Sequence, residues 1–152
     1  MKIEYSFAKP DDLPKWLEVA DDVGGIMRIP DMRNDKTFLE YAKRKLENNN
    51  AIMAFDKVNN KCTGFIGFSH TNNSITWLGV KSDYRNQGIG SKLLSLALNQ
   101  LDNNKPIKVN TYPASYLPGK PARNLYFKYG FIETSKEIFL IDELEMVELT
   151  RH

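Results

Sequence analysis

The stretch Val80–Ser91 reads VKSDYRNQGIGS and decides the fold of this 152-residue chain. Two of its residues, Gly88 and Gly90, lack a Cβ atom, so the backbone there can turn tightly and approach a ligand closely. The apolar residues that follow, from Leu93 to Leu101, have helical spacing and predict a helix directly after the loop. Because a predicted strand ends where the stretch begins, the glycines lie between a strand end and a helix N-terminus.

Such a position favours the binding of an anion. It gathers unpaired backbone N–H groups and the positive end of the helix dipole, which together hold phosphate. Arg85 and Lys92 add charged donors. The stretch is not a Walker loop, because GxxxxGK[ST] is missing, and it departs from GxGxxG after Gly90. Taken alone, it indicates an anion site, and the alternative is a glycine-containing connector without a ligand.

The residues before this loop predict an alternation of strands and helices. The expected order is a strand at 2–7, a helix capped by Asp11 or Asp12 and ended by Gly24-Gly25, a second helix at 35–46, and strands at 51–55, 63–68 and 75–80. Asparagine pairs at 59–60 and 72–73 mark the turns between the three strands. These strands form a predicted antiparallel meander.

The residues after the loop predict a crossover to a parallel strand. The helix leads to a strand at 107–112, and a strand–helix–strand unit of this kind implies a parallel pair. A helix at 122–129 and two strands, at 131–141 and 144–151, complete the chain. The predicted fold is therefore α/β, with a mixed, mostly antiparallel sheet of about seven strands flanked by about four helices. We expect residues 1–152 to form a single domain.

Bulk composition restricts the partners. Hydrophobic residues make up 41% and charged residues 26% of the chain, as in soluble globular proteins. The formal net charge of +2 is too small to indicate nucleic acid, and no apolar run approaches the roughly 20 residues of a membrane span. The single cysteine, Cys62, excludes an internal disulfide, and no Cys/His cluster indicates a metal. We expect a cytoplasmic protein without a metal or a membrane partner.

Two motifs in register resemble those of the GCN5-related N-acetyltransferase (GNAT) superfamily. The first is Arg-x-x-Gly-x-Gly at 85–90, and the second is ARNLYFKYGF at 122–131, which is similar to the family pattern AxxLYxxxGF. The resemblance covers essentially the whole chain and implies acetyl-CoA as the cosubstrate. It implies that Leu78 and Val80 offer backbone groups to pantetheine. It also implies a pyrophosphate loop formed by Arg85, Asn86, Gln87, Gly88, Ile89, Gly90 and Ser91.

The resemblance also implies a catalytic role for Tyr126, as general acid to the leaving thiolate. A thiol with a pKa of about 8.5 is a moderate leaving group, and a phenol with a pKa of about 10 can donate a proton to it. The alternative is an aromatic side chain that packs in the core or against the coenzyme. We expect Tyr129, one turn further on, to pack.

The chain departs from the family in two ways. Gly119 stands where many relatives carry an asparagine, and Asn124 is the candidate to replace it in coenzyme binding. The strand 74–80 has no carboxylate to act as a base. Deprotonating an alkyl ammonium at neutral pH costs about 4.6 kcal/mol, so direct attack with proton removal through water is expected. The other candidate bases are expected to be surface residues; they are Glu18, Asp21, Asp22, Asp31 and His70.

The predicted function is the transfer of an acetyl group from acetyl-CoA to a primary amine of a small molecule or a peptide. The resemblance implies that the acceptor lies between residues 23–36 and 111–121. These segments contain Tyr112 and Tyr116 and no acidic cluster for a polyamine. The main alternative is a noncatalytic acyl-CoA-binding or regulatory domain, and another is a nucleotide- or RNA-binding module. The acceptor, the base and the use of other acyl-CoAs stay open, as does a homodimer formed through the final strands.

Overall fold

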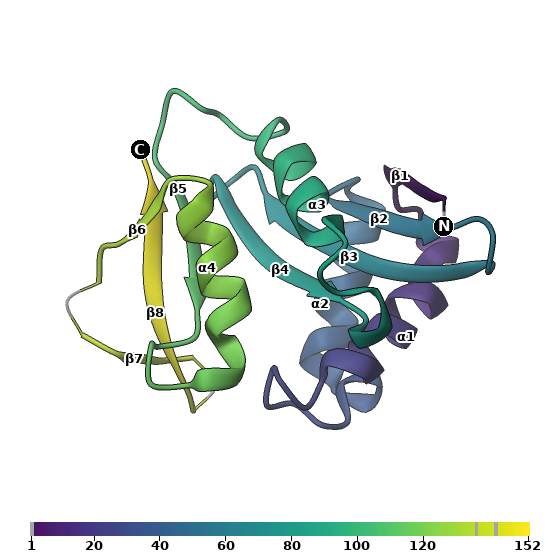
Figure 1. The fold of residues 1–152 in the computed structure, drawn as a ribbon, viewed down its shortest axis with the longest axis horizontal. Coiled ribbons are helices and arrows are strands. Elements are labelled where there is room, and N and C mark those ends of the chain that lie inside the picture. The colour runs from purple at the N-terminus through teal and green to yellow at the C-terminus, as the bar shows by residue number, and fades with distance from the viewer. Residues whose placement is uncertain (1, 136, 142) are drawn as a thin grey trace.

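The computed structural model describes residues 2–135, 137–141 and 143–152 and has an α/β fold (Figure 1). Its strands are β1 (Ile3–Phe7), β2 (Ala51–Asp56), β3 (Lys61–Ser69), β4 (Ser74–Val80), β5 (Ile107–Thr111), β6 (Phe131–Glu133), β7 (Phe139–Ile141) and β8 (Leu144–Arg151). Its α-helices are α1 (Leu13–Val23), α2 (Lys36–Glu47), α3 (Ile89–Leu98) and α4 (Lys120–Lys128). Along the described residues, no helix has both the length and the apolarity needed to cross a membrane.

The strands form a mixed sheet in the order β1-β2-β3-β4-β5-β8-β6, and β7 pairs with β8. Neighbours from β1 to β4 are antiparallel, which confirms the predicted meander. β4 and β5 are parallel, and α3 is the crossover between them. A mixed, mostly antiparallel sheet with four α-helices confirms the predicted fold class.

β4 and β5 diverge soon after they begin to pair, as Figure 1 shows. Their parallel pairing covers Ser74 with Lys108 and Ile75 with Val109. The next residue of β4, Thr76, lies in a bulge, because the register between β3 and β4 shifts at this point. A bulge bends its strand and increases its twist. The bend accounts for the opening between β4 and β5.

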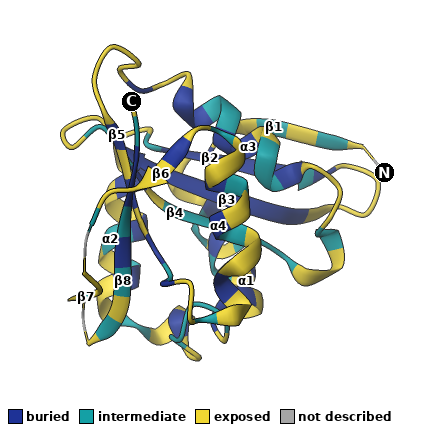
Figure 2. Cartoon of the chain, turned by 60° about the vertical axis from the view of Figure 1, so that its left-hand side comes forward, coloured by how far each residue is buried: buried dark blue, intermediate teal, exposed yellow. Residues whose placement is uncertain are grey.

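Each face of the sheet is covered by a helix pair, α1 and α2 on one side and α3 and α4 on the other (Figure 1). On the first face, Trp16 is fully buried and stacks on Phe65 with ring centroids 4.7 Å apart. On the second face, Leu93 and Leu94 are fully buried. The central strand β3 is buried along nearly its whole length (Figure 2). Because β4 pairs with β3, the strand that diverges from β5 is anchored to the buried centre of the sheet.

α2 has a capping side chain, whereas the cap predicted for α1 from Asp11 or Asp12 does not form. Asp35 caps α2, because its carboxylate accepts the N–H of Phe38 at 3.0 Å. Asp12 precedes α1, but its carboxylate accepts the N–H of Lys9 at 2.8 Å and makes no capping bond to the helix. Asp12 therefore stabilises the turn that leads into α1 instead of its first N–H groups.

The predicted strand 131–141 is wrong as a continuous element. β6 ends at Glu133 and β7 begins at Phe139, and residue 136, between them, lies outside the described residues. The N–H groups of Thr134 and Ser135 both approach the carbonyl of Glu148, at 3.0 and 3.4 Å. Two consecutive donors on one acceptor break the alternation of an antiparallel ladder. The chain therefore leaves β8 after β6 and returns to it at β7.

Candidate functional site

A cavity of about 470 Å³ lies next to the opening between β4 and β5. The end of α1, the end of β4 with its glycine loop, and α4 all contribute to its wall. Eight of the predicted coenzyme-binding residues line it, namely Leu78, Val80, Arg85, Asn86, Gly88, Ile89, Gly90 and Ser91. The other two, Gln87 and Asn124, are exposed and lie outside this lining. Their roles in binding stay predictions.

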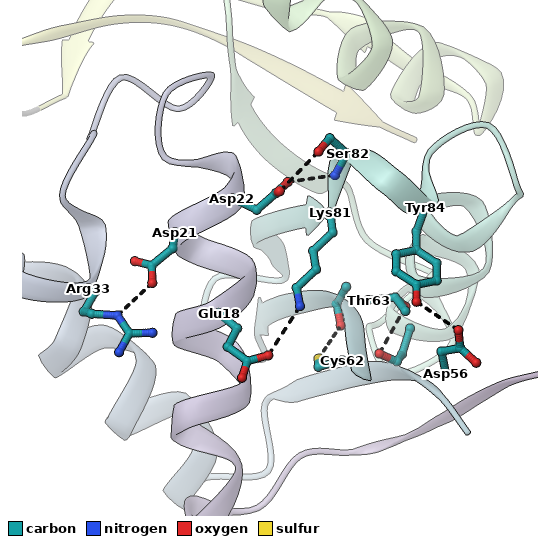
Figure 3. Close-up of polar contacts among 12 residues, drawn as sticks. Glu18, Asp21, Asp22, Arg33, Asp56, Cys62, Thr63, Lys81, Ser82 and Tyr84 are labelled. Atoms are coloured by element: carbon teal, nitrogen blue, oxygen red, sulfur yellow. Dashed lines mark hydrogen bonds and ion pairs between the residues drawn. The ribbon is translucent and has the colours of Figure 1, made fainter. Parts of the chain in front are cut away.

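Hydrogen bonds fix the segment that leads into the glycine loop (Figure 3). The carboxylate of Asp22 on α1 accepts the backbone N–H of Ser82 at 2.7 Å and its hydroxyl at 3.2 Å. Two residues later, the hydroxyl of Tyr84 donates to the buried carboxylate of Asp56 at 2.9 Å. The start of the loop is thus held between α1 and β2.

The glycine loop presents backbone N–H groups that no side chain caps. Asn86 and Gly88 both have positive φ, 61° and 80°, and Gly88 is the N-cap residue of α3 without a capping side-chain bond. A Cβ on Gly88 would meet nothing within 4 Å, so its φ is what requires glycine. The N–H of Lys92 donates to the carbonyl of Gly88, which leaves the N–H groups of residues 89–91 without helical acceptors. This arrangement suits a phosphate group.

The free edge of β4 offers further backbone groups. The N–H of Lys81 donates to the carbonyl of Thr63 at 2.8 Å, and antiparallel partners alternate in hydrogen bonding. Val80 and Leu78, one and three residues earlier, therefore direct their N–H and C=O groups away from β3 and into the opening. The side chain of Arg85 already donates to the carbonyl of Val80 at 3.2 Å. This leaves the N–H of Val80 and both backbone groups of Leu78 facing the opening.

A second hollow, of about 680 Å³, lies on the side of α1 and carries carboxylates on its wall. Glu18 pairs with Lys81 at 3.3 Å, and Asp21 pairs with Arg33 at 2.7 Å, as Figure 3 shows. These contacts give Glu18 and Asp21, both candidate bases, surface ion pairs. Within the described residues, no group of three or more His, Cys, Asp or Glu side chains is placed to hold a metal ion.

Tyr126 lies beneath the cavity and does not form part of its lining. Its side chain is 4% exposed and packs edge-on against Phe131 with ring centroids 5.6 Å apart. Burial raises the pKa of Tyr126 well above its ordinary value, and the neighbouring phenols of Tyr112 and Tyr41 add to the rise. The hydroxyl therefore keeps its proton at neutral and moderately alkaline pH.

The two segments expected to hold an acceptor lie against each other. The hydroxyl of Tyr116 donates to the carbonyl of Ile26 at 2.7 Å, and the guanidinium of Arg28 lies 4.8 Å from the centre of the Tyr116 ring. Tyr112 lines the cavity beside them, and burial raises its pKa to about 12. The contact between the segments closes one wall of the cavity.

A family model described as an acetyltransferase (GNAT) domain matches residues 47–133, which is more than half of the chain. Both sequence motifs, at 85–90 and 122–131, fall inside this match. The chain belongs to the GNAT acetyltransferase family. A search of curated protein sequences found no match to it.

Solved structures share the GNAT fold along nearly the whole chain. The PaiA N-acetyltransferase from Thermoplasma acidophilum, in complex with coenzyme A, has a TM-score of 0.75 and 19% identity and covers 97% of this chain and 98% of its own. An Arabidopsis thaliana protein in complex with the bisubstrate analogue CoA-Ac-MVNAL has a TM-score of 0.71 and 19% identity, with 100% and 99% covered. Diaminobutyrate acetyltransferase from Paenibacillus lautus has a TM-score of 0.71 and 16% identity, with 99% and 95% covered.

The departure of this GNAT chain at Gly119 has a steric reason. A Cβ at this position would lie 2.5 Å from the Cβ, Cγ and Cδ2 atoms of Tyr112. An asparagine cannot stand there while Tyr112 keeps its place in the cavity wall. In this chain the ring of Tyr112 therefore fills the space that an asparagine side chain at position 119 would need.

Sequence reasoning missed one basic residue of the GNAT cavity, Lys128. Ala122, Leu125 and Lys128 all line the cavity, and their spacing of three places them along one side of α4. This spacing of three could have indicated Lys128 from the sequence, but the family pattern AxxLYxxxGF emphasises Tyr126 instead. Lys128 brings a second positive charge to the cavity beside Arg85, whereas Lys92 is exposed and outside the lining.

Tyr129 ties the two helices on this face together. Its hydroxyl lies 2.6 Å from the hydroxyl of Ser91 and donates to the carbonyl of Ser91 at 3.1 Å. The expected packing role of Tyr129 therefore includes a polar link to the first turn of α3, where the glycine loop ends.

Proposed function

We propose that the whole chain, residues 1–152, acts as one enzyme that transfers an acetyl group from acetyl-CoA to a primary amine of a small molecule or a peptide. The observation that carries the proposal is the opening between β4 and β5, which ends at the uncapped N-terminus of α3. Acetyl-CoA has an extended pantetheine arm joined to a pyrophosphate. The free edge of β4 would suit the arm, and the anion site at the start of α3 would suit the pyrophosphate.

The residues of the opening fit this donor. The N–H groups of residues 86–91 would hold the pyrophosphate, and Arg85 and Lys128 would add positive charge. The free backbone groups of Leu78 and Val80 would hold the pantetheine arm along β4. Along β4 the arm would run from the loop toward the closed end of the opening, where Ile75 and Tyr126 belong to the same core cluster.

The chemistry would need one proton donor and one exit for the proton of the amine. The amine attacks the thioester carbon, the C–S bond breaks, and the sulfur takes a proton. Tyr126 would supply that proton or share it through a hydrogen bond, since burial keeps its phenol protonated. The proton of the ammonium would leave through water.

A thiol-release assay with acetyl-CoA tests the proposal against amino acids, small amines and short peptides. The protein thiol does not interfere, because Cys62 is 1% exposed and burial raises its pKa to about 12. We expect release of free coenzyme A with at least one class of amine. Tight acetyl-CoA binding without turnover across the panel would favour the noncatalytic alternative, and the absence of both would refute the coenzyme site.

A further inference from the structure

Two hydroxyl groups meet at the closed end of the opening. The hydroxyl of Tyr41, on α2, lies 2.5 Å from the hydroxyl of Thr76 on β4. Thr76 directly follows Ile75, the residue of β4 that pairs with Val109. The side chain of Thr76 is exposed to solvent. The pair therefore marks the point at which β4 begins to separate from β5.

The local backbone is shaped to admit this pair. Gly67 on β3 lies beneath it, and a Cβ at Gly67 would overlap the Tyr41 hydroxyl and stand 3.3 Å from the Thr76 hydroxyl. The bulge between β3 and β4 makes Thr76 the extra residue between Ile75 and Trp77. A glycine and a bulge together thus allow the long Tyr41 side chain to reach the sheet.

The pair and Tyr126 approach the opening from opposite faces. Tyr41 belongs to the cluster packed under α1 and α2, and Tyr126 belongs to the cluster under α3 and α4. Ile75, the residue directly before Thr76, belongs to the same core cluster as Tyr126, and the Tyr41 phenol adds to the raised pKa of Tyr126. Leu78, which lines the cavity, is two residues beyond Thr76, about 7 Å along the strand.

The charged groups around Tyr41 are cationic. Arg44 lies close enough to act on the Tyr41 phenol, and the ammonium of Lys45 lies 5.6 Å from the centre of its ring and donates to the carbonyl of Phe68. Burial raises the pKa of Tyr41 far above its ordinary value, so its phenol keeps its proton and is able to donate it to Thr76. With Tyr41 donating to it, the hydroxyl of Thr76 keeps a lone pair and its own proton for a ligand.

We propose, as a step within the proposed acetyl transfer, that Thr76 binds the amine of the acceptor and that Tyr41 orients Thr76 for this role. An N–H of the ammonium donates to the Thr76 oxygen, and adjacent water carries one ammonium proton to solvent. The free amine then attacks the thioester carbon, the C–S bond breaks, and the proton from Tyr126 goes to sulfur. The amide nitrogen loses its extra proton to the same water, and Tyr126 regains a proton from solvent.

In this assignment the neutral hydroxyl of Thr76 takes the place of the carboxylate that β4 lacks. Removing the ammonium proton costs about 4.6 kcal/mol at neutral pH, and an exposed hydroxyl with water beside it gives that proton a path to solvent. Thr76 is then a catalytic residue, since it touches the acceptor. Tyr41 is a positioning residue, since it acts through Thr76.

The test compares Thr76→Val, Thr76→Ser, Tyr41→Phe and Gly67→Ala on the best amine found in the thiol-release assay. Thr76→Val should lower kcat/KM for the amine by about 10-fold to 100-fold, with the KM for acetyl-CoA unchanged, and Thr76→Ser should restore most of it. Tyr41→Phe and Gly67→Ala should give smaller losses of the same kind. The loss in Thr76→Val should shrink as pH rises from about 7 to about 9.5, because more of the amine enters uncharged.

Three results would overturn this assignment. Thr76→Val could keep kcat/KM within two-fold of the wild-type value, the loss could be independent of pH, or Thr76→Ser could fail to restore activity. A loss of acetyl-CoA affinity in Thr76→Val, measured by calorimetry, would also overturn it, since the residue would then serve the donor. Failure of the proposed function itself would give a different result, because the wild-type protein would then release no coenzyme A with any amine.

Discussion

The ring of Tyr112 lies directly against the backbone of Gly119: a Cβ at Gly119 would stand 2.5 Å from three atoms of Tyr112. Both residues are tied to α4. Gly119 precedes the helix as its N-cap. The guanidinium of Arg123 on α4 donates a hydrogen bond to the carbonyl of Tyr112 at 2.8 Å. The glycine and the tyrosine therefore form one unit that sets where α4 begins relative to β5.

Gly119→Ala is expected to destabilise the protein by about 1–3 kcal/mol, because the added methyl group overpacks the contact with Tyr112. Urea unfolding followed by circular dichroism measures the change. Gly25→Ala is the matched control, since a Cβ at Gly25 would meet nothing within 4 Å, and it should stay within about 0.5 kcal/mol of the wild-type value. Equal stability of both variants would show that Tyr112 can move away from Gly119.

Alanine at Gly88 and at Gly90 should change stability in opposite directions. Gly88→Ala places a side chain at a φ of 80° and should cost about 1–2 kcal/mol. Gly90→Ala lies inside α3, where its Cβ meets Leu125 at an ordinary 3.4 Å, and should stabilise the helix by up to about 1 kcal/mol. Thermal unfolding measures both effects.

Both glycine variants should nevertheless bind coenzyme A more weakly than the wild-type protein. The added methyl group stands on the backbone that the pyrophosphate is proposed to approach, whatever its effect on folding. Isothermal titration with coenzyme A measures the affinity, and we expect a loss of about 10-fold or more for each variant. Unchanged affinity in the stable Gly90→Ala protein would place the pyrophosphate elsewhere.

The loop and its two flanking elements could be predicted from the sequence because their signals are local. Glycine spacing, the apolar pattern from Leu93 onward, and the motif that ends at Phe131 each lie within a short stretch. The break of the last predicted strand could not be predicted, because it depends on Thr134 and Ser135 sharing the carbonyl of Glu148. That contact joins residues far apart in the sequence.

The contact between Tyr41 and Thr76 was similarly beyond local reasoning. Tyr41 lies 35 residues before Thr76 in the sequence, and only the bulge at Thr76 brings its hydroxyl to β4. A bulge depends on the pairing partner as well as on its own strand, so the sequence of β4 alone, SITWLGV, does not place it at Thr76. Gly67, which makes room for Tyr41, reads in the sequence as an ordinary interruption of a strand.

Stability at acidic pH should depend on the bond between Tyr84 and Asp56. Burial acts to raise the pKa of Asp56, but hydrogen bonds from Asn59, Tyr84 and Val58 together lower it below its ordinary value. The contribution of a carboxylate with a lowered pKa is present above the unfolded pKa of about 3.9. It is lost as pH falls through the folded value. Tyr84→Phe removes one of these bonds and weakens that contribution.

The stability deficit of Tyr84→Phe should therefore be largest near pH 6 and should narrow toward about pH 3. Urea unfolding across this range measures it. Tyr129→Phe is the matched control, because its hydroxyl bonds to Ser91 and to no carboxylate, so its deficit should stay constant with pH. A constant deficit in both variants would mean that Tyr84 does not influence the ionisation of Asp56.

Tyr126→Phe should lower kcat by about 10-fold to 100-fold and leave the KM for acetyl-CoA within two-fold. Its phenol, with a pKa raised by burial, would act mainly as a hydrogen-bond donor to the departing sulfur, whose conjugate acid has a pKa of about 8.5. Steady-state thiol release measures both constants. Because the pKa is raised, the wild-type kcat should show no loss from this group as pH rises toward about 10.

Two comparisons make the Tyr126 experiment decisive. Tyr5→Phe, on β1 and remote from the cavity, should leave kcat unchanged, which controls for the loss of a phenol in general. Tyr112→Phe should affect kcat less than Tyr126→Phe if Tyr126 is the donor, although Tyr112 lines the cavity and Tyr126 does not. The reverse order would move the role of general acid to Tyr112, and equal, small effects of both would leave the sulfur to take its proton from water.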